Sequence, residues 1–168
     1  MVLDPNKLKT EYLNLLEAKA ETAEEAAQAW VDAYETYALD ATAIGFSPPN
    51  ITPASKQAMK ATLQAYFANV DVANPAGAAS TIASALSVFW LTPPVVFSPP
   101  APPLPFVAVT GVIGTPALQA SLQAIFAVVG GTEDSKATAI SGAMDIFTKL
   151  VQVTLLNPPA PPIIGFLL

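Results

Sequence analysis

The segment MKATLQAYFA at 59–68 returns as LQASLQAIFA at 118–127, so the pattern LQAxFA occurs twice in the chain. Downstream, ASTIASAL at 79–86 matches ATAISGAM at 137–144 at nearly the same separation. Matched blocks in a shared order indicate an internal repeat, and a repeat decides the fold because each copy forms one supersecondary unit.

The proline-rich ends of these copies also match, and a fainter copy precedes them. PPAPP at 99–103 recurs unchanged at 158–162. Near the N-terminus, LKTEYLNLL at 8–16 aligns with the first block and AAQAWVDAY at 26–34 aligns with the second, before FSPP at 46–49. The chain thus contains three versions of one pattern.

We therefore predict a single domain over 1–168 that contains three repeats and an apolar tail. The repeats cover 1–49, 50–100 and 101–162, and the tail covers 163–168. One such unit buries too few apolar side chains to offset the entropy of ordering its backbone, so the units are expected to pack together.

Each repeat is predicted to be a pair of helices, because its apolar residues recur at helical spacing. In the first repeat the apolar stripe consists of Ala26, Trp30, Ala33, Tyr34, Tyr37 and Ala41. The corresponding stripes are Ile82, Ala85, Leu86 and Phe89, then Ile140, Ala143, Met144 and Phe147. The expected fold class is all-α, with three tandem helical hairpins, about six helices, separated by proline-rich connectors.

Helix starts follow the capping rules. The expected N-caps are Asp4, Thr52, Thr115 and Asn74, each followed by proline, then Thr22 with Glu25 as a capping box, and Thr132 or Asp134. Double prolines end each pair, because proline lacks the amide hydrogen and disfavours helix in the residue before it.

The densest proline run, at 98–106, is expected to form a stiff polyproline II rod. It leads into a valine-rich insert at 107–114, which the other copies lack. The segments 95–97, 106–109 and 151–155 are β-prone and allow a minor short sheet beside the helices.

The composition excludes most kinds of catalytic and metal-binding site. The 168 residues include no Cys and no His, and all seven basic residues are lysines, which removes thiolate, imidazole and bidentate guanidinium groups. We therefore predict no enzymatic activity, no catalytic residue, no cofactor, no metal and no small-molecule substrate. With a net charge of −6 and a pI near 4.4, nucleic-acid binding is not expected.

The remaining carboxylates and serines offer little chemistry. Glu21, Glu24 and Glu25 resemble a carboxylate cluster, but an acid-rich helix start that complements the helix dipole is the simpler interpretation. The same holds for Glu133 and Asp134. An enzyme built on this chain would need a pocket of carboxylates, lysines and hydroxyls alone.

Charge is distributed unevenly. Residues 1–40 carry nine acids against three lysines, whereas no charged residue occurs between Asp71 and Glu133. Charged residues make up 12% of the chain, against roughly 25% in ordinary soluble domains. We therefore expect extensive contact with further copies or with a larger assembly. The start MVLDP shows no signal peptide and no stretch is a convincing membrane span, so neither secretion nor membrane insertion is expected.

The predicted interaction residues lie in the proline rod and in the C-terminal tail. They are Pro99, Pro100, Pro102, Pro103, Leu104, Pro105, Phe106, Ile163, Ile164, Phe166, Leu167 and Leu168. The rod is interpreted first as a rigid connector packed on the helices. Two alternatives are a docking peptide for WW or SH3 grooves and a contact between subunits.

The opening MVLDPxxL, the AAQAWVDAY helix and the final PPxxG-hydrophobic tail resemble small virion structural proteins of tailed bacteriophages of T4-like and marine types. The resemblance implies a multi-copy capsid, neck or tail component that assembles in the host cytoplasm with itself and with other virion proteins. Two alternatives are a peptide-presenting adaptor that displays the proline rod and a small membrane-active lysis protein.

Overall fold

The computed structural model describes residues 3–44, 46, 48–69, 74–97, 106–128, 130–156 and 162–168, and its main body is a bundle of six helices. The helices are α1 (Pro5–Ala18), α2 (Ala23–Ala38), α3 (Pro53–Phe67), α4 (Pro75–Leu91), α5 (Thr115–Ala127) and α6 (Glu133–Lys149). The predicted mostly helical architecture with six helices is confirmed.

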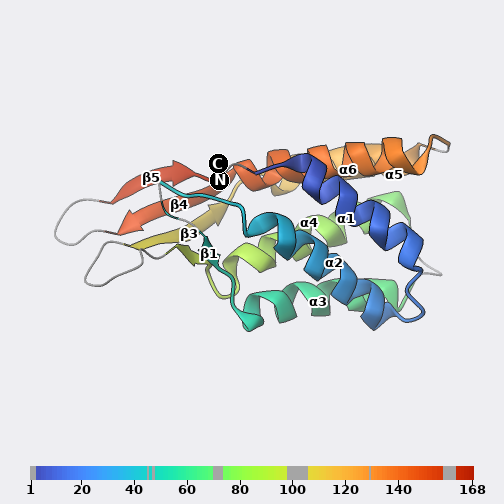
Figure 1. Cartoon of the computed structure of the whole chain (residues 1–168), viewed down its shortest axis with the longest axis horizontal. Helices are drawn as coiled ribbons and strands as arrows, with labels where there is room; N and C mark the ends of the chain where they lie inside the picture. The colour runs from blue at the N-terminus through green and yellow to red at the C-terminus, as the bar shows by residue number, and fades with distance from the viewer. Residues whose placement is uncertain are drawn as a thin grey trace.

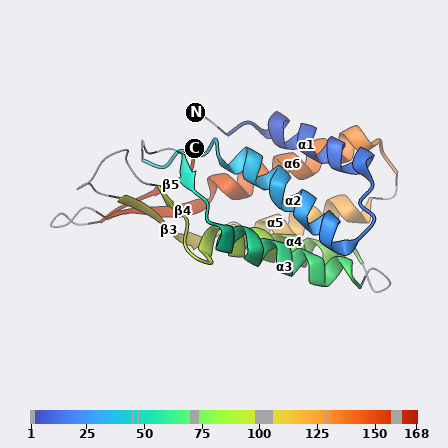
Figure 2. The same ribbon diagram turned by 60° about the horizontal axis from the view of Figure 1, so that its bottom comes forward.

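The helices form a closed ring in chain order. Each helix packs against the next one along the chain, and α6 packs against α1 (Figures 1 and 2). The last residues of α1, α3 and α5 and the first residues of α2, α4 and α6 lie at one end of the elongated molecule. The opposite ends of the helices face the strands, which lie at the other end.

Local capping explains five of the six helix starts. Side chains of Asp4, Thr22, Thr52, Asn74 and Thr132 accept hydrogen bonds from backbone N–H groups in the first turns of their helices. The predicted capping box of Thr22 and Glu25 is present.

The prediction for Thr115 is wrong. Thr115 is the first residue of α5, and the N-cap is Gly114, which offers no side-chain cap. The Thr115 hydroxyl instead lies 2.8 Å from the hydroxyl of Ser87 on α4. A contact between helices has therefore replaced the local cap.

The all-α prediction needs correction, because a five-stranded antiparallel sheet occupies one end of the molecule. Its strands, in spatial and chain order, are β1 (Pro49–Asn50), β2 (Val96–Phe97), β3 (Phe106–Val112), β4 (Val151–Leu156) and β5 (Ile163–Phe166). Pairing of the predicted segments gives β2, β3 and β4, while β1 and β5 extend the sheet on both sides. The sheet is therefore larger than the minor element expected.

The sheet forms because the connections between helical pairs meet at one end. Pro49 pairs with Phe97, and Val96 pairs with Ala108, so two connectors lie side by side. Along β3 and β4, Val107, Val109 and Val153 are buried, whereas the intervening residues are more exposed. This alternation puts one face of the sheet on the core.

The buried apolar residues form one contiguous core cluster that includes residues of all six helices and of strands β2, β3 and β4. Each predicted stripe contributes to it, for example through Tyr34, Leu86 and Met144. Two residues of the predicted stripes, Trp30 and Ile140, are only half-buried. The division of the chain into three repeats stays a prediction.

A chain of hydrogen bonds crosses this core and joins one helix from each pair. The Trp90 indole N–H donates to the Tyr34 hydroxyl at 2.8 Å. The Thr148 hydroxyl donates to the Met144 carbonyl at 2.8 Å, which leaves Tyr34 as the donor in its 2.7 Å bond to Thr148. Helices α2, α4 and α6 are thereby fixed in register through fully buried side chains.

A second buried contact joins α2 to α6. The Tyr37 hydroxyl donates to Asp145 Oδ1 at 2.6 Å, and Lys149 Nζ lies 2.8 Å from the other carboxylate oxygen. Asp145 is 7% exposed, so its charge is compensated inside the bundle by a phenol and an ammonium group.

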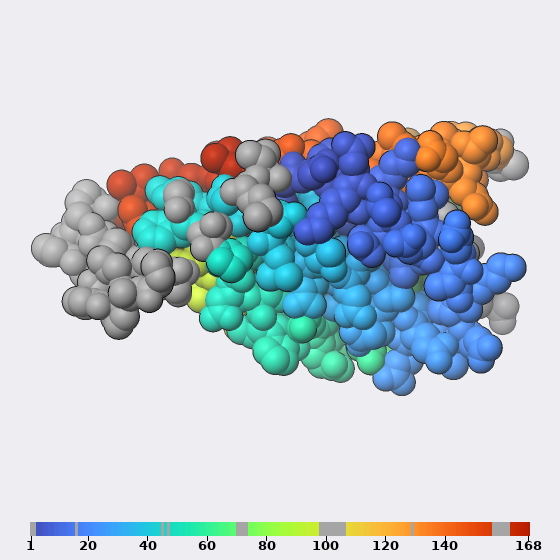
Figure 3. Space-filling view, in the orientation of Figure 1, coloured from blue at the N-terminus to red at the C-terminus, as the bar shows by residue number. Residues whose placement is uncertain are grey.

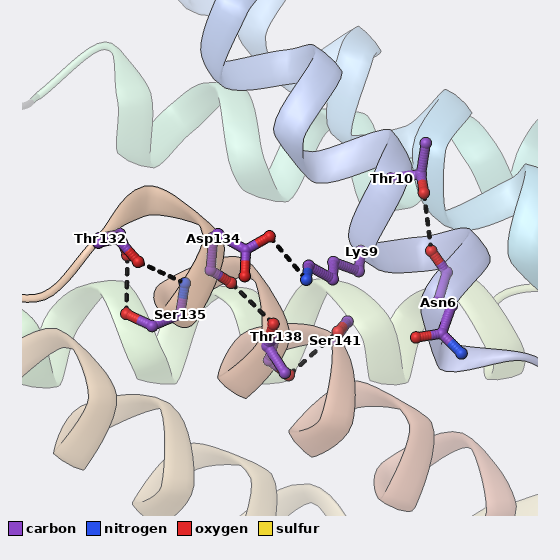
Figure 4. A network of polar contacts seen from close by, with 8 residues as sticks. All are labelled: Asn6, Lys9, Thr10, Thr132, Asp134, Ser135, Thr138 and Ser141. Carbon is purple, nitrogen blue, oxygen red and sulfur yellow. Dashed lines mark hydrogen bonds and ion pairs between the residues drawn. The ribbon is translucent and has the colours of Figure 1, made fainter.

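The seam between α1 and α6 closes the ring. At this seam Lys9 Nζ lies 2.7 Å from Asp134 Oδ1 (Figure 4). Deeper in the seam, the buried Tyr12 hydroxyl donates to the Met144 sulfur at 2.8 Å. The two ends of the helical region therefore meet through one surface ion pair and one buried contact.

Replacing Thr148 with valine tests the buried hydrogen-bond chain. T148V keeps the shape of the side chain but leaves the Tyr34 proton without its acceptor, so the free energy of unfolding should fall by about 1–3 kcal/mol. The matched control is T138V, which removes a hydroxyl bonded to a carbonyl on the exposed side of the same helix and should change stability by less than about 0.5 kcal/mol. Equal losses for both variants in urea titrations would contradict the role of the network.

Alkaline pH should destabilise the fold. Burial raises the pKa of Tyr12, Tyr34 and Tyr37 above the ordinary value near 10, and for Tyr37 the bond to the Asp145 carboxylate raises it further. Below pH 10 both folded and unfolded states keep these protons, so this contribution to stability is fully present. Above pH 10 only the unfolded state loses them, and the free energy of unfolding should fall by up to about 1.4 kcal/mol per pH unit for each tyrosine.

Urea titrations between pH 8 and pH 11 measure this slope. Tyr37→Phe should make the slope shallower, because one of the three retained protons is gone. A stability that stays constant up to pH 11 would contradict the assignment.

Candidate functional site

The structure places the predicted interaction residues in two groups. Pro99, Pro100, Pro102, Pro103, Leu104 and Pro105 lie outside the described residues. Phe106 is the first residue of β3. The remaining residues, 163–168, form β5 and the two residues after it. Apart from Phe106 on the inner strand β3, the described part of the prediction therefore lies in the edge strand β5 and in the two residues that follow it.

Strand β5 exposes most of its apolar side chains. Ile163 is 55% exposed, Ile164 64% and Phe166 44%, and Leu168 beyond the strand is 62% exposed. Since side chains alternate along a strand, Ile164 and Phe166 lie on the same face, next to Thr154 and Gln152 of β4. An apolar stripe thus runs along the edge of the sheet.

The end of β5 is anchored to the fold. Leu167 is buried and forms a β-bridge with Ala43, and the backbones of Leu168 and Thr42 exchange two hydrogen bonds of 3.0 and 3.1 Å. Ile44 lies against Gly165 closely enough that a Cβ there would come within 3.1 Å of its side chain. The strand is consequently presented in a fixed position.

Charge is missing from this part of the molecule. None of the residues of β1–β5 is charged, although edge strands in natural proteins commonly carry charges that block pairing with other chains. Seven of the eight exposed large apolar side chains in the described part lie between Ile113 and Leu168, and the eighth is Leu39. The exposed apolar surface is concentrated in the C-terminal third.

A second feature lies in the half of the bundle farther from the sheet. An apolar cavity of about 430 Å³ opens there among α1, α2, α5 and α6, near two of the hairpin turns. Its apolar lining consists of Tyr12, Leu15, Trp30, Ile125, Phe126, Ala137 and Ile140. The Tyr12 and Trp30 rings stack at 4.8 Å, and Phe67 stands 6.5 Å from Trp30 on its other side.

The rim of this cavity is polar. Glu133 and Lys136, both in the first turn of α6, line it together with the apolar residues. A second hollow of about 380 Å³ shares Leu15 and Trp30 with the cavity and extends towards Glu21 and Glu25. The α1–α2 and α5–α6 hairpins form this end of the surface (Figure 3).

Sequence reasoning missed the cavity. Trp30 and Ile140 are in the predicted apolar stripes, and a stripe by itself indicates a packed core. The only related signal was the acid-rich start of α2 at Glu24 and Glu25, one turn before Trp30, and it does not by itself indicate a cavity. Leu15 and Phe126 gave no signal, because they close the cavity only when α1 and α5 come together.

The acidic residues considered as a carboxylate cluster have separate structural roles. The Glu25 carboxylate accepts hydrogen bonds from the backbone of Glu21 and Thr22. Glu24 pairs with Lys60 at 2.8 Å, and the hydrogen bond and charge of that lysine lower the pKa of the Glu24 carboxyl. Within the described ranges, no three Cys, His, Asp or Glu side chains come close enough to hold a metal ion. None of the helices described is long and apolar enough to cross a membrane.

Comparison with known proteins adds no relative: no family model, no curated protein and no solved structure matches the chain. The two surface features, the β5 edge and the apolar cavity, are therefore the basis for any inference about function.

The cavity predicts different environments for the only two tryptophans of the chain. Trp90 is fully buried, whereas Trp30 is half-buried on the cavity wall. Acrylamide should therefore quench mainly the emission of Trp30. In a Trp30→Phe variant the remaining fluorescence should be blue-shifted, with a quenching constant several-fold lower than that of the wild type. An unchanged constant would show that Trp30 is as shielded as Trp90.

Proposed function

We propose that this chain is a non-enzymatic structural protein that acts by self-association, as a multi-copy component of a tailed-phage virion. The observation that carries the proposal is the uncharged sheet whose edge strand β5 exposes Ile163, Ile164 and Phe166. A monomer in water gains nothing from such an edge, because it leaves apolar side chains in solvent.

The polar groups of the bundle support a structural role. Ion pairs between helices use three carboxylates, in the pairs Lys9–Asp134, Lys56–Glu35 and Lys60–Glu24, and Lys7 of α1 pairs with Asp40, which follows α2. The buried carboxylate of Asp145 is bonded to Tyr37 and Lys149. Each of these acidic groups is thus engaged by a group of the fold, which supports a structural role for them.

Assignment to a virion rests on the sequence resemblance to small phage structural proteins, and its place in the particle is part of the proposal. The adaptor alternative depends on display of residues 99–105, which lie outside the described residues. The exposed β5 edge favours self-association over that alternative, because it offers apolar contact area without the proline rod.

Sedimentation velocity over a micromolar concentration range tests the proposal. The wild type should sediment as species heavier than the 17.4 kDa chain, increasingly so at higher concentration. I164K places a charge on the exposed stripe and should shift the protein to monomer without lowering its unfolding midpoint, since Ile164 is 64% exposed.

The matched control is L39K, which places the same charge on the one exposed large apolar residue outside the C-terminal third and should leave association unchanged. A wild type that stays monomeric at every concentration would refute self-association. Equal loss of association in both variants would refute the role of β5.

A further inference from the structure

The apolar cavity is open to solvent, and the edge strand β5 exposes apolar side chains to solvent. The two features lie at opposite ends of the molecule. The sheet occupies one end of the elongated molecule and the turns of α1–α2 and α5–α6 occupy the other (Figures 1 and 2). The fixed position of β5, bonded to β4 and to the 42–43 segment, keeps a chain from filling its own cavity with its own strand. Only another molecule can bring the two together.

We propose that copies of this chain associate head to tail, with the exposed apolar stripe of β5 in one copy seated in the α1–α2–α5–α6 cavity of the next. This inference rests on the proposed self-association and adds the identity of the two surfaces. The stripe offers Ile164 and Phe166, and the cavity offers the half-buried Trp30, Phe126 and Ile140.

The size of the cavity suits this occupant. Its volume of about 430 Å³ falls within the roughly 300–1,000 Å³ of sites that enclose several apolar groups. Its lining is apolar and its rim is polar at Glu133 and Lys136. Protein interfaces have the same arrangement, in which an apolar side chain is buried at the centre and the polar rim stays hydrated.

Charge distinguishes between the ways in which two copies can meet. The cavity and the neighbouring hollow are lined by three acids, Glu21, Glu25 and Glu133, and by two lysines, Lys19 and Lys136, so contact between two cavity ends would bring two surfaces of net negative charge together. Contact between a cavity end and a sheet end avoids this repulsion, because none of the residues of the five strands is charged. The charge distribution therefore favours an asymmetric contact over a symmetric one at the cavity.

Because each copy would use different surfaces at its two ends, the contact would propagate into rings or open filaments.

A mixing experiment with two blocked variants tests the geometry. I164K places a charge on the apolar stripe of β5 and leaves the cavity unchanged. I140W fills the cavity and leaves the β5 stripe unchanged. Each variant alone should sediment as a monomer, and an equimolar mixture should form a dimer of twice the chain mass and nothing larger, because one competent contact remains. L15W, which fills the same cavity from α1, should behave like I140W, and circular dichroism with urea titration checks that each variant folds.

The outcomes separate this inference from the proposed function. A monomeric wild type would refute self-association itself. A wild type that associates together with a mixture that stays monomeric would refute only the head-to-tail contact. Assembly of I140W and L15W at wild-type strength would also overturn the inference, and would indicate symmetric pairing of β5 strands with the cavity left to a small apolar solute.

Discussion

The fold depends on one phenolic hydroxyl. The Tyr34 hydroxyl accepts a hydrogen bond from the Trp90 indole N–H and donates one to the Thr148 hydroxyl, so three helices from three successive hairpins meet at a single buried oxygen atom. A buried polar atom that lacks one of these partners costs more than the bond itself contributes, which makes the arrangement selective for one register of α2, α4 and α6. Apolar packing alone tolerates helix shifts of the kind that this network forbids.

Once those three helices are fixed, the remaining architecture follows from chain connectivity. Short turns keep α1, α3 and α5 beside their partners, and the ring closes where Tyr12 and Lys9 of α1 reach α6. All connections between hairpins then meet at one end, and their backbone groups need partners there. Pairing of the connectors with one another, and with the C-terminal strands β4 and β5 that follow α6, supplies those partners, so the sheet is a consequence of the ring.

Sequence predicts the parts of this structure that are local. Helix starts at Asp4, Thr22 and Asn74 depend on residues within one turn, and the helical stripes depend on periodicity within one helix. The full sheet was not predictable in the same way: β1 has only two residues, too few for an alternating pattern, and its partner β2 is distant in the chain. Thr115 shows the same limit, because a neighbouring helix competes successfully for its hydroxyl. That the apolar tail is a contact surface stays a prediction, and its place as an edge strand, like the cavity, follows only from the tertiary arrangement.

The distribution of charge along the molecule connects stability with assembly. Lysines and acids are used at the seams of α1, α2, α3 and α6, where exposed pairs contribute little energy but keep the helical surface hydrated. The strands receive none, although a lysine on β5 would cost the fold almost nothing at a position as exposed as Ile164. Folding of the single chain therefore does not account for an uncharged edge. The proposed contact with another molecule would account for it, because burying an unpaired charge in an interface is far more costly than burying isoleucine.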